Sequence, residues 1–316
     1  MTEKGIRLSL SQGFARRASR RSAKDFFKGN LTYILFVLPA FTIYTILTII
    51  PLVNTVIYSF TNFNGLSPNY EFVGIGNYLR AFSTRNAATA FGNSITYALV
   101  VPILITLLAL PLALLLDSQM KTRNIQRAIF FFPSVISSLF LGFIWNFILS
   151  PSNQGLINSL LLSAGQQKLL LLADPRAAMV LLIMVSVWAS TGWHACIYLA
   201  NLQVIDKTFY EAADIDGANG WQKFRFITLP NLAPAMTVSV MFLLIGSLKA
   251  FDLPFALTNG GPGYATTMIT QTIINEGVNS NRVGFASAMS VLFLLLIGVV
   301  TAFQVGILGR REEKLT

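Results

Sequence analysis

The sequence has few residues that perform covalent or metal chemistry. Its 316 residues include one cysteine, Cys196, and one histidine, His194. A single cysteine excludes an intrachain disulfide, and the lack of a Cys or His cluster argues against a metal site. The chain also has no Gly-x-x-x-x-Gly-Lys-Ser/Thr loop for nucleotide phosphates. We therefore expect neither an enzyme nor an ATPase, and no cofactor or metal bound by this chain.

Charge is also scarce. Only 11% of the residues are charged, 54% are hydrophobic, and the mean hydropathy is +0.62. A soluble protein of this length would carry more charge on its surface, so the apolar blocks indicate that membrane lipid surrounds most of the chain. The net charge is +10, but 8 of the 23 basic residues precede residue 30, and no basic helix with interleaved aromatics follows. This distribution favours an orientation signal over a nucleic-acid partner.

Six apolar blocks are long enough to cross a bilayer. They lie at residues 31–60, 94–116, 128–149, 177–202, 232–257 and 285–308. The first contains Pro39 and Pro51 and is predicted to be kinked. Residues 150–176 contain shorter apolar pieces that favour interfacial helices. We therefore expect an all-α membrane protein with a basic tail (1–28), a six-helix transmembrane domain (29–308) and a short C-terminal tail (309–316).

The basic residues predict the orientation of these spans. If the two tails and the segments 117–127 and 203–230 face the cytoplasm, those regions hold 17 of the 23 basic residues. The outer segments then hold 5, and Lys249 lies within a span. This asymmetry follows the positive-inside rule. Both termini and residues 206–230 are accordingly predicted to be cytoplasmic.

Residues 206–230 form a polar interruption between the fourth and fifth spans, and they predict two short helices. Thr208 followed by Glu211 fits a capping box, and Gly217 occupies a place where a helix ends in a left-handed residue. Asn219 with Gln222 offers a second helix start, and Pro230 opposes continuation of that helix. An apolar stripe follows at helical spacing: Trp221, Phe224 and Ile227. On these features alone, the segment is an amphipathic surface helix-turn-helix.

The same segment resembles the cytoplasmic coupling motif of ABC importer permeases. That motif reads Glu-Ala-Ala, three residues, Gly, nine residues, Ile, any residue, Leu-Pro, and every fixed position is present: Glu211, Ala212, Ala213, Gly217, Ile227, Leu229 and Pro230. Residues 72–78 resemble the first external loop of the family. The run Leu-Thr-Asn-Gly-Gly-Pro at 257–262 is similar to the carbohydrate-uptake branch, the maltose and glycerol-3-phosphate type. The resemblance extends from about residue 30 to the end.

The resemblance implies a multi-pass subunit of a bacterial or archaeal cell membrane. It would pair with a second homologous permease, and two copies of a cytoplasmic ABC ATPase would bind ATP and Mg. An extracytoplasmic solute-binding protein would deliver the sugar. The coupling segment would insert into a cleft on the ATPase, with Glu211 and Gly217 the most important residues and Ala212 and Ala213 allowing close approach. The alternatives are that Glu211 caps its own helix and that Gly217 is a plain C-cap.

The resemblance also places sugar contacts in the middle of the fourth and fifth spans. By position the closest matches are Ser186, Ser190 and Trp193 in the fourth span and Ser247 in the fifth. Trp188 of the fourth span and Lys249 and Asp252 of the fifth are further candidates for the substrate pathway. Ala250 stands where a polar residue is expected. The alternative is that the serines serve helix packing and the tryptophans lie at the lipid interface. Lys249 and Asp252 are a turn apart, which predicts an intrahelical ion pair with a structural or gating role.

Three other functions compete with a sugar permease. The first is an importer permease for another solute, such as glycerol-3-phosphate, a polyamine or an amino acid. The second is an ion-coupled secondary transporter, which needs acidic residues at the membrane midplane, where Asp252 is the single candidate. The third is a membrane-embedded enzyme, which the lack of a His, Cys or carboxylate cluster disfavours.

Overall fold

The computed structural model describes residues 23–118 and 120–312. This part of the chain is almost entirely helical, and its β pairing is one isolated bridge between Thr61 and Phe72. The chain divides into two compact units, residues 1–55 and 56–316. Most of the predicted basic tail, residues 1–22, and the last four residues of the C-terminal tail lie outside the described residues.

The first unit is one long apolar helix. It contains α2 (Ala23–Tyr44), a π-helical turn η1 (Thr45–Ile49) and the beginning of α3 (Ile50–Tyr58). Residues 35–58 are long and apolar enough to cross a membrane. The π turn ends two residues before Pro51, where the missing N–H and the bulk of the proline ring disfavour an ordinary α turn. The predicted kink is thus a wider helical turn, and Pro39 lies inside α2 without ending it.

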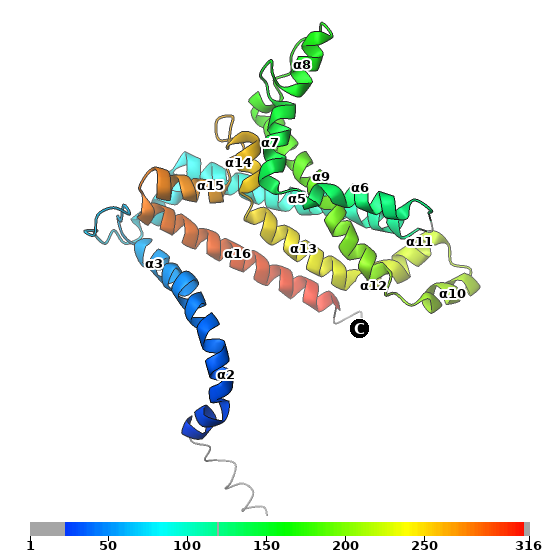
Figure 1. The fold of residues 1–316 in the computed structure, drawn as a ribbon, viewed down its shortest axis with the longest axis horizontal. Helices are drawn as coiled ribbons and strands as arrows, with labels where there is room; N and C mark the ends of the chain where they lie inside the picture. Colours follow the sequence, from blue (N-terminus) through cyan, green and yellow to red (C-terminus); the bar gives the residue numbers. More distant parts are fainter. Residues whose placement is uncertain (1–22, 119, 313–316) are drawn as a thin grey trace, which may run out of the picture. The chain divides into compact units, whose positions relative to one another are not determined.

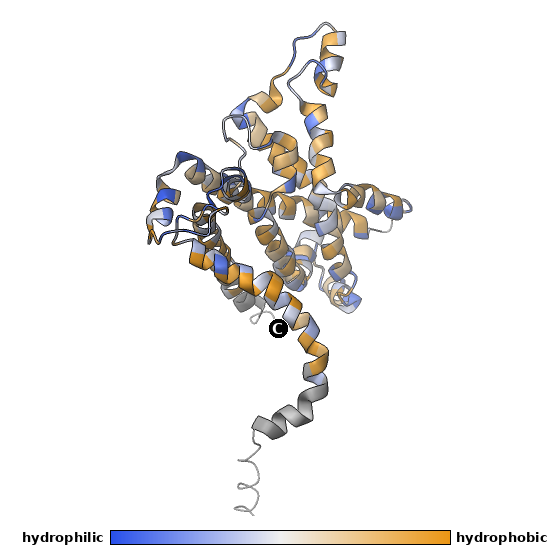
Figure 2. Ribbon diagram, turned by 60° about the vertical axis from the view of Figure 1, so that its left-hand side comes forward, coloured by the Kyte–Doolittle hydropathy of each residue, from blue (hydrophilic) through white to orange (hydrophobic). Residues whose placement is uncertain are grey.

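The second unit is a helical bundle with three further straight candidate spans. These are α5 (Arg85–Asp117), α9 (Pro175–Leu202) and α16 (Val283–Glu312). Two bent helix pairs are also long and apolar enough to span, so the described residues hold four candidate spans, or six if each bent pair counts as one. Figure 1 shows α5, α9, α13 (Ala233–Leu248) and α16 running through the bundle, and in Figure 2 their residues are mostly hydrophobic while the connecting loops are hydrophilic. The predicted all-α membrane fold is confirmed.

Helix α5 lies in the centre of this bundle, against α9 and α13 (Ala233–Leu248). Its small residues Ala109 and Ala113 are fully buried, and Tyr198 and Leu182 of α9 are also fully buried. Small side chains let membrane helices approach closely, which compensates for the absence of a hydrophobic drive between helices in lipid. The core therefore fixes α5, α9 and α13 relative to one another.

The predicted fifth span, 232–257, is wrong as a single helix. Helix α13 ends at Leu248, and α14 (Asp252–Thr258) begins after a three-residue break. Pro254 explains the break, because in a continuous helix its ring would collide with the carbonyl of Ala250 four residues earlier. That freed carbonyl instead accepts a hydrogen bond from Thr270 Oγ1 at 2.7 Å. A backbone group released within a membrane thus finds a partner from another element.

The predicted third span, 128–149, is also broken. Helices α6 (Arg123–Val135) and α7 (Ser138–Leu149) meet at 93°. Helix α7 turns to pack on α14, where a Cβ on Gly142 would lie 2.5 Å from that of Ala256. Asn146 Nδ2 donates to the carbonyl of Leu257 at 2.6 Å, at the end of α14. The helix α7 that follows the break at 136–137 therefore packs on the helix α14 that follows the break at 249–251.

Short elements complete the second unit. They are α4 (Gly76–Ser83), α8 (Leu156–Ser163), the 3-10 turn η2 (Leu171–Ala173), α15 (Ile269–Ile274) and the π turn η4 (Asn275–Asn279). Helix α8 projects from the bundle beyond α7 (Figure 1). Asn158, which is buried, donates to the carbonyls of Ser150 and Leu169 at 3.0 and 2.9 Å and holds this segment in shape. Short helices in 150–176 were predicted and are present; their interfacial position stays a prediction.

Candidate functional site

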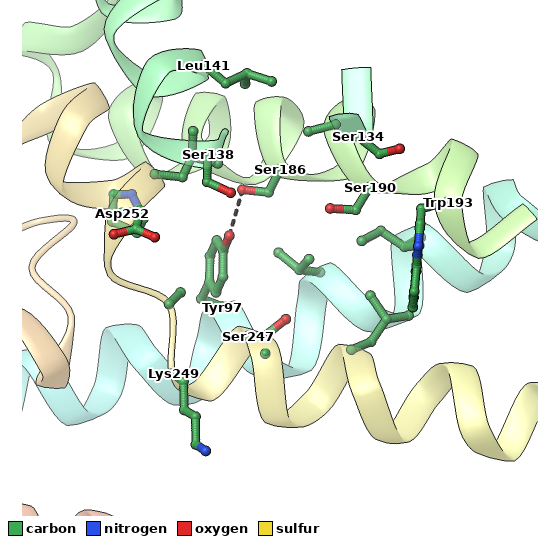
Figure 3. A pocket seen from close by; sticks show the side chains of 18 of the residues that line it. Tyr97, Ser134, Ser138, Leu141, Ser186, Ser190, Trp193, Ser247, Lys249 and Asp252 are labelled. Atoms are coloured by element: carbon green, nitrogen blue, oxygen red, sulfur yellow. Dashed lines mark hydrogen bonds between the residues drawn. The ribbon is translucent and has the colours of Figure 1, made fainter. Parts of the chain in front are cut away.

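A cavity of about 480 Å³ lies in the second unit, beside both helix breaks. Helices α5, α9 and α13 form its length, and residues of the breaks at 136–138 and 249–252 complete it (Figure 3). A broken helix brings polar backbone into the apolar bundle, and such backbone is tolerated in membranes where it lines a cavity. The bends that the sequence did not predict thus add Ser138, Lys249 and Asp252 to the polar lining.

Tyr97 and Ser186 join α5 to α9 in the cavity wall. Tyr97 Oη donates to Ser186 Oγ at 2.6 Å, and Ser186 Oγ donates to the carbonyl of Leu182 at 2.6 Å. Both side chains are buried. Ser186 was predicted, whereas Tyr97 was missed because it stands in a long apolar run. Its signal was present, since a tyrosine buried in a span needs a partner for its hydroxyl.

Three predicted residues share the adjoining space. The side-chain hydroxyls of Ser190 on α9 and Ser247 on α13 form no hydrogen bond with a described residue, so they are free to meet a ligand. Trp193 is 39% exposed, and its ring packs edge-on against Phe242 with centroids 6.0 Å apart. The arrangement offers an aromatic wall with hydroxyls beside it (Figure 3).

Lys249 and Asp252 lie at the break between α13 and α14 and also line the cavity. The predicted intrahelical ion pair is wrong, because Pro254 ends the helix that would bring the side chains together. No ion pair joins them in the described structure, and the Lys249 side chain points away from Asp252 (Figure 3). Both residues are exposed. Ala250 lies between them in the cavity lining.

Trp188 does not line the polar cavity with the other predicted sugar contacts. It is 48% exposed and packs edge-on against Trp145, with centroids 5.5 Å apart. It lines a separate, apolar cavity formed by α5, α6 and α9. Of the predicted tryptophans, Trp193 alone therefore lines the polar cavity.

His194 also lines the polar cavity and connects α9 to α13. Its Nδ1 lies 2.7 Å from Ser239 Oγ, and both side chains are buried. Helices α9 and α13 flank residues 206–230 in the chain. A hydrogen bond between them beside the cavity links its wall to the helices on either side of that segment.

Residues 206–230 contain the predicted pair of short helices, at the end of the bundle opposite α14 and α15 (Figure 1). The first is α10 (Lys207–Ile215), but its predicted capping box is wrong. Asp206 is the N-cap, and its side chain accepts from the Thr208 N–H at 2.9 Å. This hydrogen bond lowers the pKa of Asp206. Glu211 therefore lies beyond the first turn and does not cap its own helix.

Gly217 ends α10 with a positive φ of 73°. The N–H of Ala218 donates to the carbonyl of Ala213 at 2.9 Å, and the N–H of Gly217 donates to the carbonyl of Asp214 at 3.1 Å. These two bonds form a Schellman motif, which requires a left-handed residue at the glycine position. The predicted helix end is confirmed. A Cβ at Gly217 would meet nothing within 4 Å, so backbone conformation alone selects the glycine.

The second helix begins at the predicted residue. Asn219 and Gln222 form a reciprocal capping box at the start of α11 (Gly220–Lys223). The helix continues through a π turn, η3 (Phe224–Thr228), into α12 (Leu229–Asn231), so Pro230 lies inside it and does not end it. As at Pro51, the π turn ends two residues before the proline and accommodates it.

Side chains hold the two short helices together. Lys223 forms an ion pair with Asp214, and Tyr210 Oη lies 2.9 Å from Thr228 Oγ1. Thr228 is buried at the base, where Leu232 is fully buried against the bundle. We call residues 206–231 the elbow. It is a preformed helix-turn-helix anchored at its second helix.

The exposed surface of the elbow is unusually apolar. Phe209, Ile215, Trp221 and Phe226 have exposed fractions from 54% to 88%. Of the motif residues, Glu211, Ala212 and Gly217 are exposed, whereas Ala213, Ile227, Leu229 and Pro230 are partly buried. The Glu211 carboxylate accepts no hydrogen bond from another described residue. Large apolar side chains gathered on an exposed segment mark a surface for another protein or for lipid.

Comparison with known proteins places the chain in a family. The model of the binding-protein-dependent transport system inner membrane component matches residues 87–314. A probable starch degradation products permease of Thermoanaerobacterium thermosulfurigenes is 33% identical over 92% of this chain and 98% of its own. A trehalose/maltose permease of Thermococcus litoralis is 34% identical over 83% and 88%. An arabinooligosaccharides permease of Halalkalibacterium halodurans is 30% identical over 98% and 97%.

The fold is also that of a solved transporter chain. A chain in the crystal structure of a bacterial ABC transporter involved in the import of the acidic polysaccharide alginate superimposes with a TM-score of 0.78. The overlap covers 90% of this chain and 98% of that one, at 23% sequence identity. The family match over 87–314 and the identity to these curated relatives establish that the chain belongs to the family of inner-membrane permease components of binding-protein-dependent ABC importers.

Proposed function

We propose that this chain is the permease subunit of an importer for a sugar or oligosaccharide. It forms the pathway with a second homologous permease, receives the sugar from an extracytoplasmic binding protein, and is driven by two copies of a cytoplasmic ABC ATPase. The observation that carries the proposal is the polar cavity, where hydroxyls and one tryptophan face a shared space at two helix breaks. Relatives named for sugar transport support the substrate class.

The cavity suits a neutral, polyhydroxylated ligand. Its free hydroxyls, Ser190 and Ser247, donate and accept hydrogen bonds, as sugar hydroxyls do. The exposed face of Trp193 supplies an apolar surface for a sugar ring. Ser186 is held by Tyr97 and presents a fixed acceptor. Lys249 and Asp252, which form no ion pair with a described residue, line this space at the α13–α14 break and act as gate residues, because charges inside a membrane protein mark pathways.

The elbow is the proposed ATPase contact. Glu211, Ala212 and Gly217 lie on its exposed side, and Ile227, Leu229 and Pro230 form the base that joins it to α13. Because the elbow is preformed and anchored at one helix, movement of a docked ATPase is transmitted to α9 and α13. This assignment places residues 206–231 and both termini in the cytoplasm, in agreement with the basic residues.

A reconstituted complex tests the function. We expect proteoliposomes that contain this chain, its partner permease and its ATPase to take up maltotriose, trehalose or arabinotriose when ATP is inside and the loaded binding protein is outside. Uptake of radiolabelled sugar is the measurement. Transport by this chain alone, driven by an ion gradient without ATP, contradicts the proposal. So does ATP-driven uptake confined to an amino acid or a polyamine.

The two tryptophans of α9 test the location of the pathway. We expect Trp193→Ala to lower uptake about tenfold, because it removes the aromatic wall, worth roughly 0.5–1.5 kcal/mol beyond its buried area. Trp188→Ala, on the same helix but outside the polar cavity, should change uptake less than about twofold. Both variants should assemble, since each ring is well exposed. Equal losses of uptake in the two variants would show that the polar cavity is not part of the sugar pathway.

A further inference from the structure

A second polar cavity, of about 420 Å³, lies at the end of the bundle opposite the elbow. It is enclosed by the beginning of α5, the loop between α14 and α15, and the helical turns α15 and η4. Its volume is within the range of small-molecule sites, about 300–1,000 Å³. With the elbow in the cytoplasm, this cavity opens on the face where the binding protein docks. We call it the outer cavity.

The lining of the outer cavity is polar but nearly neutral. It consists of amides, hydroxyls and glycine backbone, contributed by Asn86, Asn259, Thr267, Gln271, Asn275 and Ser280 among others. No lysine or arginine is among its described lining residues. Its one carboxylate, Glu276, already pairs with Arg282 at 3.2 Å. An anion would find no cation there and a metal ion no carboxylate cluster, whereas sugar hydroxyls find both donors and acceptors.

The outer cavity is preorganised. Asn93 Nδ2 donates to the carbonyls of Tyr264 and Thr267 at 2.9 and 3.1 Å, which fixes the loop to α5. Thr267 Oγ1 donates to the carbonyl of Gly260 at 2.9 Å. Gln271 is 3% exposed, and its Oε1 has no donor among the described residues. A buried acceptor without a donor costs free energy, and a ligand hydroxyl would remove that cost.

Tyr264 adds an aromatic surface at the cavity. Its side chain is 52% exposed and its backbone is held by Asn93. A tyrosine with a fixed backbone and an exposed ring offers its face to a sugar ring at little entropic cost. Aromatic face and neutral hydrogen-bonding groups are therefore present in both cavities.

The two cavities share a structural element. Thr270, on α15 beside Gln271, donates to the carbonyl of Ala250 at 2.7 Å, at the helix break that lines the polar cavity. Helix α14 connects that break to the loop of the outer cavity. A ligand in the outer cavity thus lies against the element that supports the inner break.

We propose that the outer cavity is a second carbohydrate site, which holds a sugar ring released by the binding protein before it enters the polar cavity. This inference rests on the proposed sugar transport. Tyr264 stacks on the ring, and Asn86 of α5 and Gln271 of α15 bind its hydroxyls. The site retains the sugar during transfer, so its loss lets ATP be hydrolysed without a sugar being carried.

The test measures the number of sugar molecules transported per ATP hydrolysed, in proteoliposomes with saturating binding protein. The substrate is whichever of maltotriose, trehalose and arabinotriose the wild-type protein transports. We expect Tyr264→Ala to lower this ratio about three- to tenfold, the loss of one aromatic stack. Tyr264→Phe should retain it. The matched control is Phe82→Ala, an aromatic on α4 that is 70% exposed and outside the cavity lining. Both Tyr264 and alanine carry a Cβ, so the backbone at this position is equally strained in wild type and variant.

The outcomes are distinct. Wild type that transports none of the three sugars contradicts the proposed function. If the wild type transports one of the sugars and Tyr264→Ala leaves the sugar-to-ATP ratio unchanged, the proposed outer site is wrong and the proposed function stands. A normal ratio with more binding protein needed for half-maximal ATPase stimulation would make the cavity a protein-docking surface and also overturn it. If Tyr264→Ala fails to assemble, Asn86→Ala decides, because Asn86 is partly exposed and forms no side-chain hydrogen bond to a described residue.

Discussion

Gly217→Val is expected to abolish most transport, by more than about tenfold, while the permease complex still assembles. Residue 217 has a φ of 73°, in the left-handed region. A valine held in that conformation costs about 1–2 kcal/mol of free energy, and its β-branching raises the cost further. A cost of that size shifts a conformational equilibrium by roughly 5–30-fold. The Schellman bonds from Ala218 and Gly217 to α10 would open, and the two short helices would lose their fixed angle.

The companion variant is Gly217→Asn. Asparagine also adds a Cβ, into space where nothing lies within 4 Å, but it tolerates the left-handed region. We expect it to retain at least about half of wild-type uptake. The measurements are uptake and ATPase activity in proteoliposomes, with assembly followed by co-purification of the ATPase.

The pair separates a coupling joint from a plain helix end. Lost uptake with retained ATPase binding in Gly217→Val, and its recovery in Gly217→Asn, supports the joint. Wild-type transport by Gly217→Val would show that the angle between α10 and α11 is unimportant. Equal loss in both variants would mean that the glycine is needed for closeness to a partner surface, since both add atoms at the same place.

The sequence predicts the spans well because lipid selects long apolar blocks, but it does not predict where they bend. Pro254 lies inside a hydrophobic block that is long enough for a span. The length of the block therefore predicts a continuous helix, although the proline prevents a helical hydrogen bond to the carbonyl of Ala250, four residues earlier. The ion pair between Lys249 and Asp252 was predicted from helical spacing and failed for the same reason. Helical spacing predicts side-chain contacts only where the helix is continuous, and a proline can interrupt that helix.

The elbow shows which local signals are reliable. Gly217 and the Asn219–Gln222 box were predicted correctly, because each depends on backbone chemistry within a few residues. The first cap was wrong because Asp206 competes with Thr208 for the same role and lies two residues earlier. In the cavity, Tyr97 was missed because its partner Ser186 is 89 residues away in sequence. Contacts of that range arise from the bundle and leave no periodic trace.

A second large effect is expected at Gly192, where α9 passes α6. A Cβ built on Gly192 would lie 1.9 Å from the carbonyl oxygen of Phe130 and 2.5 Å from its carbon. Real Cβ atoms do not approach within 3.0 Å, and the obstacle is backbone, so α6 must move as a unit. Overpacking lowers the free energy of unfolding by about 1–3 kcal/mol where side chains can adjust. Because backbone must move here, we expect Gly192→Ala to lower it by more than about 3 kcal/mol.

The matched control is Gly298→Ala on α16, another glycine of a membrane helix, where a Cβ meets nothing within 4 Å. Replacing glycine by alanine in a helix interior is favourable by itself, by roughly 0.5–1 kcal/mol. Gly298→Ala should therefore be as stable as wild type or more so. The yield and Tm of detergent-extracted protein measure both variants, and an unchanged Tm in Gly192→Ala would contradict the packing of α6 on α9.

The displacement of α6 has a functional consequence beyond stability. Helix α6 ends at the break beside Ser134, which lines the polar cavity, and α9 carries Ser186, Ser190 and Trp193. Moving α6 away from Gly192 widens the gap between these two walls. Any Gly192→Ala protein that still assembles should therefore transport less than Gly298→Ala protein at equal amounts in the membrane. Normal transport per folded molecule would show that the close contact of the two helices serves folding and that the cavity does not depend on it.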